Sequence, residues 1–159
     1  MTPQELKNST LQLAIRGRLV EQRAEEGTAQ VLYKQIQAEK KRLIKAGKIK
    51  KEKPLPEINE DEKQFAIPDS WMWVRLPEIT YGAGNKSNQI LAKEVKPEGK
   101  YPAVSQGAKL IDGYYDFDEK IVFDLPLVMF GDHTRNVKYI DFPFVVSADG
   151  TKFMKAVGV

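Results

Sequence analysis

The chain has 159 residues, with 42% apolar content, 30% charged content and a net charge of +3, which fits one domain, or a small domain plus an appendage, with a modest core. It contains no cysteine and a single histidine, which excludes disulfides, thiolate metal sites, a cysteine nucleophile and any site built on two histidines. No apolar run approaches the roughly 18 residues of a membrane helix, and the N-terminus lacks a signal-peptide pattern, so we expect a cytoplasmic protein without membrane contact.

The N-terminal sequence predicts a helix that begins at a capping box. Thr2 suits the N-cap, Pro3 suits the first helical position, and Glu5 can bond back to the cap amide. Apolar residues then recur at broadly helical spacing, and Gly17 is expected to weaken the helix near its end. These apolar residues are Leu6, Leu11, Leu13, Ala14, Ile15, Leu19 and Val20. So wide an apolar stripe needs a partner.

A second helix is predicted between Thr28, a candidate N-cap, and Gly47. Its apolar face consists of Val31, Leu32, Ile36, Leu43 and Ile44. Residues 1–53 are therefore expected to form an N-terminal helical hairpin with a basic tail. Because two helices alone cannot bury both apolar stripes, we expect self-association, with a homodimer formed through these helices.

Positive charge is concentrated at the end of this helical region. Residues 34–53 carry nine basic and two acidic residues, whereas residues 54–79 have a net charge of −4 and residues 80–159 are neutral. A polyanion such as DNA would be attracted to the basic cluster first. The candidate phosphate contacts are Lys40, Lys41, Lys48, Lys50 and Lys51. The alternative is a solvated helix face that runs into a flexible tail.

The second half of the chain shows the two-residue period of β-strands. Residues 54–64, with two prolines and few apolar side chains, are expected to form a linker. Alternation over residues 71–76 predicts a strand. Further strands are expected at residues 101–105, 108–115, 120–123, 127–131, 137–140, 144–147 and 151–154. The predicted fold class is α+β, with the helical hairpin followed by a mainly β domain over residues 65–159.

The segment GDHTRN, residues 131–136, contains the only histidine beside an acid. Asp132 and His133 could act as an acid and base, or hold a metal with Asp141 or Asp149, but no metal-binding motif or second histidine is present. A plain turn is the second alternative. We favour a loop that presents donors to nucleic acid, because arginine can bond guanine and asparagine can bond adenine bidentately. The candidate residues are His133, Thr134, Arg135, Asn136 and Lys138. We expect no catalytic residue, metal or cofactor.

A second polar loop, SQGAK at residues 105–109, has the same character. Gln106 is a candidate adenine reader, and Lys109 is a candidate phosphate contact. The alternative interpretation is an ordinary hairpin turn.

Four stretches, taken together and in order, are more specific than any one alone. They are LKNSTLQLAIRGRLVEQ, IQAEKKRLIKAGKIKKEKPLPEI, IPDSWMWVRLPEI and PLVMFGDHTRNVKYIDFPFVVSADGTKFMKAV. They resemble the N-terminal part of the specificity subunit of a type I restriction-modification enzyme. The resemblance implies N-terminal helices followed by a first target recognition domain that reads one half of a bipartite target in double-stranded DNA. It also implies a non-catalytic role, in which partner modification (methyltransferase) subunits methylate adenine and restriction subunits translocate and cut DNA.

The length departs from the family pattern, since a full specificity subunit continues with a spacer helix and a second recognition domain. We therefore expect residues 65–159 to be an incomplete recognition domain or one without its spacer helix, as in a natural truncation, a half-subunit or an artificial fragment. The alternative function is a protein interaction module that docks on the modification subunit, or self-associates, without binding DNA alone. DNA binding should weaken steeply with salt, whereas apolar docking should hardly change.

Overall fold

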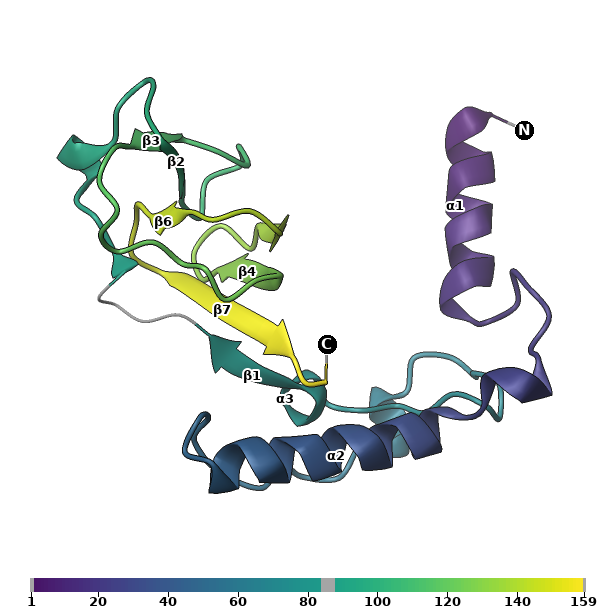
Figure 1. Cartoon of the computed structure of the whole chain (residues 1–159). Helices are drawn as coiled ribbons and strands as arrows, with labels where there is room; N and C mark the ends of the chain where they lie inside the picture. The colour runs from purple at the N-terminus through teal and green to yellow at the C-terminus, as the bar shows by residue number, and fades with distance from the viewer. Residues whose placement is uncertain (1, 84–87, 159) are drawn as a thin grey trace. The chain divides into compact units, whose positions relative to one another are not determined.

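The computed structural model describes residues 2–83 and 88–158, which divide into two compact units (Figure 1). The first unit runs to Ile79, and the second runs from Thr80 to Val157. By contacts, residues 54–79 therefore belong with the helices, although we expected a linker at 54–64 and a new domain from residue 65. The functional division into residues 1–53, 54–64 and 65–159 stays a prediction.

Helix α1 (Pro3–Ile15) begins and ends as its sequence predicts. The Thr2 hydroxyl accepts from the Glu5 amide at 3.3 Å, and the Thr2 amide donates to the Glu5 carboxylate at 2.7 Å, which completes the capping box. Beyond the helix, Gly17 has a φ of +64° and its amide donates to the Ala14 carbonyl. No residue of α1 is buried, so the predicted apolar stripe stays exposed.

Helix α2 (Ala29–Lys45) follows a short 3-10 turn, η1 (Ala24–Glu26). Thr28 occupies the N-cap position as predicted, but its side chain makes no capping hydrogen bond. The helix is followed by Gly47, whose φ of +68° is the left-handed conformation that favours glycine at a helix end. Both predicted helices are therefore present.

Polar side chains on one face of α2 hold it to the short helix α3 (Leu76–Ile79). The Tyr33 hydroxyl donates to the Glu78 carboxylate at 2.9 Å, and the Gln37 amide donates to the Glu78 carbonyl at 2.8 Å. One turn further on, the Lys40 ammonium donates to the Glu52 carboxylate at 2.9 Å and also to the Pro77 carbonyl. Because these three side chains recur at helical spacing, they form a single polar seam along α2.

The prediction of a strand at residues 71–76 is wrong. Residues 71–75 form neither helix nor strand, and the Arg75 guanidinium reaches back to residues 56–62. It donates to the Pro56 and Glu57 carbonyls at 2.7 and 3.0 Å, and to the Glu62 carboxylate, in the 3-10 turn η2 (Glu60–Glu62), at 2.9 and 3.0 Å. This segment folds on itself through side chains and does not pair its backbone in a sheet.

The second unit consists of two sheets. The first is antiparallel, with strand order β1-β7-β4-β5. Figure 1 shows β7 between β1 and β4. In the second, with order β3-β2-β6, β2 pairs antiparallel with β3 and parallel with β6. The strands are β1 (Thr80–Ala83), β2 (Tyr101–Val104), β3 (Gly113–Tyr115), β4 (Leu127–Gly131), β5 (Val137–Ile140), β6 (Val145–Val146) and β7 (Thr151–Ala156), and a 3-10 turn, η4 (Ala92–Glu94), precedes β2.

The two sheets enclose the core of this unit. Val104, Met129, Ile140 and Phe144 are fully buried and belong to one cluster. Strands β4 and β5 coincide with predicted runs, whereas the predicted run at 120–123 contributes only an isolated bridge and β1 was not predicted. The α+β fold class, with helices followed by a mainly antiparallel β region, is confirmed. None of the helices in the described ranges is both long and apolar enough to cross a bilayer.

Candidate nucleic-acid interface

Three connecting segments meet around Gln106 in the second unit. They are the loop after β2, the turn between β4 and β5, and the connection from β6 to β7. The Gln106 side-chain amide donates to the Asp149 carbonyl at 2.9 Å, and its side-chain oxygen accepts from the His133 amide at 3.2 Å. One side chain thus ties all three segments together.

The backbone carbonyl of Gln106 also accepts two hydrogen bonds. It accepts from the Thr134 hydroxyl at 2.6 Å and from the Asn136 side chain at 3.0 Å. A Cβ built on Gly131 would lie 2.4 Å from the Thr134 hydroxyl oxygen and 2.8 Å from the Gln106 Cβ. Only a residue without a side chain allows this close approach, which explains the glycine in the GDHTRN segment.

Arg135 is held in an unusual backbone conformation at the tip of this turn. Its φ is +58°, in the left-handed region that a residue with a side chain rarely adopts. The Arg135 amide donates to the Gly131 carbonyl at 2.8 Å, and the Gly131 amide donates to the Asn136 carbonyl at 2.9 Å. These bonds close the turn and fix where the Arg135 side chain leaves the backbone.

Three of the predicted site residues in the second unit, Lys109, His133 and Arg135, have exposed side chains without a partner in the described part of the chain. Within the described ranges, their side chains make no hydrogen bond or ion pair. They remain available as donors to an external ligand.

Lys138 lies inside the protein, in contrast to its expected role as a DNA contact. Its residue is only 5% exposed, and its ammonium donates to the Ser105 carbonyl at 2.6 Å. Burial lowers the pKa of Lys138, and the nearby Asp112 carboxylate partly offsets this effect. From inside the protein, Lys138 therefore supports the backbone of the loop that contains Gln106.

The lysines of the predicted basic cluster in the first unit also differ in exposure. Lys41, Lys48, Lys50 and Lys51 are exposed, whereas Lys40 is 8% exposed and belongs to the polar seam of α2. The exposed lysines can attract phosphate without reading sequence.

No set of three or more His, Asp or Glu residues converges as a metal site in the described part of the chain. The Asp132 carboxylate instead lies 3.4 Å from the Lys152 ammonium. The geometry therefore offers hydrogen-bond donors and gives no support to the metal-bound alternative for Asp132 and His133.

Comparison with known proteins finds similarity to two restriction-enzyme subunits. A 75-residue segment is 52% identical to the type I restriction enzyme EcoAI specificity subunit and 51% identical to the EcoEI specificity subunit, both from Escherichia coli. The resemblance to type I specificity subunits is confirmed over these 75 residues. The matched segment is 47% of this chain but only 13% of either specificity subunit. No protein-family model and no solved structure matches the chain.

The relation to specificity subunits does not by itself assign roles to single residues. Sequence patterns singled out these loops, but they did not separate Gln106, Thr134 and Asn136, which bond the protein itself, from the exposed donors. The closely packed Gly131 was the available signal that this turn is built around a tight internal contact.

Proposed function

We propose that this chain is a non-catalytic, cytoplasmic DNA-recognition module of a type I restriction-modification system. In this role it reads one half of a bipartite target in double-stranded DNA for partner methyltransferase and restriction subunits. Similarity to two named specificity subunits supports a role in a type I restriction-modification system. The exposed donors on a tightly braced turn support the recognition role.

Arg135 is the proposed principal reader of base edges. A guanidinium can bond the guanine O6 and N7 atoms together, and this interaction is most selective when the side chain leaves a fixed backbone. The closed turn at residues 131–136 supplies such a backbone. His133 and Lys109 extend the same polar surface towards bases or phosphates.

The other predicted contacts take supporting roles in this proposal. Gln106, Thr134 and Asn136 join the loops, and Lys138 holds the Ser105 carbonyl from below. Lys41, Lys48, Lys50 and Lys51 supply sequence-independent phosphate attraction, while Lys40 stabilises the helical unit.

A salt titration of duplex binding tests this function. Binding should weaken steeply as salt rises, with a slope that decreases by about one for each phosphate-contacting lysine that is replaced by alanine. Lys41→Ala and Lys50→Ala are suitable variants because both side chains are exposed. Binding that does not respond to salt, or no binding to any duplex, would contradict the proposal.

One observation favours a second candidate, the protein interaction module. Helix α1 leaves Leu6, Leu11 and Ile15 about half exposed on a helix with no buried residue. Such a stripe fits a second copy of the chain or a modification subunit, with no need for DNA. This association should be nearly insensitive to salt, which separates it from the first candidate.

A further inference from the structure

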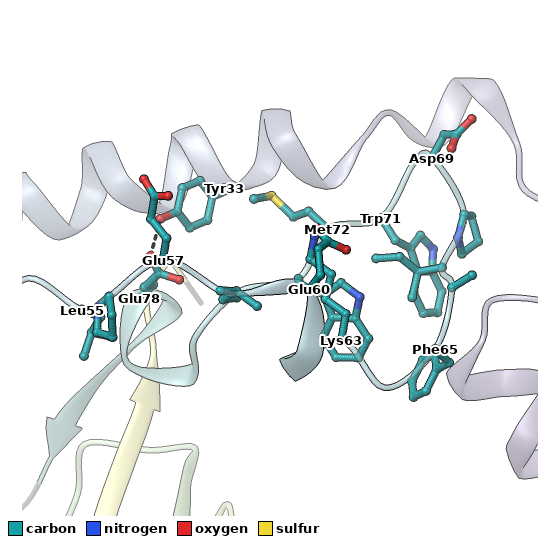
Figure 2. A pocket seen from close by; sticks show the side chains of 16 residues that line it. Tyr33, Leu55, Glu57, Glu60, Lys63, Phe65, Asp69, Trp71, Met72 and Glu78 are labelled. Atoms are coloured by element: carbon teal, nitrogen blue, oxygen red, sulfur yellow. Dashed lines mark hydrogen bonds and ion pairs between the residues drawn. The ribbon is translucent and has the colours of Figure 1, made fainter.

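The first unit contains an open groove of about 910 Å³, separate from the recognition turn (Figure 2). Helix α2 contributes Tyr33, and the remaining lining comes from residues 55–78. Figure 2 shows Phe65 and Trp71 towards one end of the groove, and Trp73 is a further aromatic lining residue. The Phe65 and Trp73 ring centroids are 5.1 Å apart.

The charge of the groove is opposite to that of the neighbouring basic cluster. Four carboxylates line it, and the only lining base, Lys63, is paired with Glu60 at 2.6 Å. Glu78 accepts from the uncharged Tyr33 hydroxyl and the Arg75 amide. The groove therefore retains a negative charge.

Two of these carboxylates are available to a ligand. Glu57 and Asp69 make no side-chain hydrogen bond or ion pair with the described residues. In Figure 2 they lie towards opposite ends of the groove, with Met72 between them. A ligand with two separated positive charges would match this spacing.

The aromatic end already accepts a cation from the same chain. The Arg16 guanidinium carbon lies 5.9 Å from the centroid of the Phe65 ring. Cations are attracted to the electron-rich faces of aromatic rings, and tryptophan is the strongest of the natural side chains in this respect. Trp71, which is 38% exposed, offers a further ring surface towards the same end of the groove (Figure 2).

The shape of the groove is fixed by the Arg75 bonds to residues 56–62 described above. A preformed groove loses little conformational freedom when it is occupied, which favours binding.

We propose that this groove binds a cationic peptide segment of a partner protein. Arginine or lysine side chains of the segment would approach Glu57 and Asp69, and an apolar side chain between them would pack on Trp71 and Met72. Nucleic acid is a poor occupant because its phosphates would meet uncompensated carboxylates. This inference is independent of DNA recognition by the second unit.

Intrinsic fluorescence provides a direct test, since the only two tryptophans of the chain, Trp71 and Trp73, both line the groove. The full chain is titrated with a short peptide of alternating arginine and leucine, and separately with its glutamate and leucine counterpart. We expect a saturable change in tryptophan emission with the arginine peptide alone. Glu57→Gln with Asp69→Asn should weaken its binding about tenfold.

Glu25→Gln with Glu26→Gln is the matched control, because both carboxylates are exposed and lie outside the groove in the same unit. This variant should bind like the wild type. Circular dichroism checks the fold of both variants, and if the groove variant unfolds, loss of wild-type peptide binding with added salt provides the second measurement.

Four results would overturn the proposal: equal responses to both peptides, equal loss in the two double variants, salt-independent binding, or a comparable emission change with duplex DNA. An emission change that follows protein concentration without peptide would instead assign the groove to a second copy of the chain.

Discussion

The two units of the chain are stabilised in different ways. Between the sheets of residues 80–157, Met129 and Phe144 are fully buried in an apolar cluster. In the helical unit, α1 has no buried residue and the buried residue of α2 is Lys40. The sheet unit thus has its own core, whereas polar bonds fix the helical unit and leave apolar surface exposed. A recognition turn needs a rigid scaffold with a packed core, as in the sheet unit. A docking region can use exposed apolar surface, as in the helical unit.

The two units should differ most in how much stability they lose when a large apolar side chain is replaced by alanine. Phe144→Ala should lower the free energy of unfolding of the sheet unit by about 3–5 kcal/mol, because it leaves a cavity in a fully packed core. Leu11→Ala in α1 should change stability by less than about 0.5 kcal/mol when both proteins are kept dilute enough to be monomers. Urea unfolding followed by circular dichroism measures both, and similar losses would show that α1 is buried after all.

The exposed stripe of α1 should drive self-association. Leu11→Asp with Ile15→Asp should weaken a homodimer by roughly 2–4 kcal/mol, since apolar contacts are replaced by charges. Light scattering of the wild type at tens of micromolar should report a dimer, and the double variant a monomer or aggregate. A wild-type monomer, with a variant of equal solubility and stability, would remove this interface.

Arg75 tests the polar stabilisation of the helical unit. Arg75→Gln should lower its stability by about 1–3 kcal/mol, because a charged donor loses its bonds to the Pro56 and Glu57 carbonyls. Lys63→Gln is the control, since its ion pair with Glu60 is local and more exposed. Equal effects on thermal unfolding would show that Arg75 does not organise this segment.

The Arg75 bond also predicts a pH dependence. Hydrogen bonding to Arg75, with support from the Asn59 amide, holds the pKa of Glu62 below its ordinary value. The contribution of Glu62 should therefore be present above its unfolded pKa of about 4.3 and be lost as pH falls through its folded pKa. Acid titration of Arg75→Gln should show a weaker dependence in this range than the wild type, and an unchanged profile would contradict the assignment.

Local signals predicted the helix ends and the central strands well. The capping box at Thr2 and the glycines at positions 17 and 47 act within one turn of the helix, so their effect can be read from sequence. The segment at residues 71–75 could not be predicted in this way, because Arg75 bonds residues up to 19 positions earlier. Strand β1 likewise depends on distant pairing with β7.

The candidate site was predictable only as a set of loops. Gln106 and Arg135 are both polar turn residues, and only the tertiary structure shows that one braces the loops while the other is exposed. Lys138 reverses the usual pattern, since it is buried while its strand neighbours Val137 and Tyr139 are exposed. The pattern of β5 therefore indicated the strand but did not show that Lys138 lies in the interior.

In the proposed function, Arg135 reads sequence from a turn that the rest of the sheet unit holds in place. The most direct test selects duplexes from a random library with the wild-type chain and then compares wild type and Arg135→Ala on the enriched and the unselected duplexes. We expect Arg135→Ala to lose roughly 1–3 kcal/mol of binding free energy on the enriched duplex, with little change on the unselected pool and unchanged protein stability. Equal losses on both would make Arg135 a phosphate contact, and no enrichment or no loss would contradict the claim.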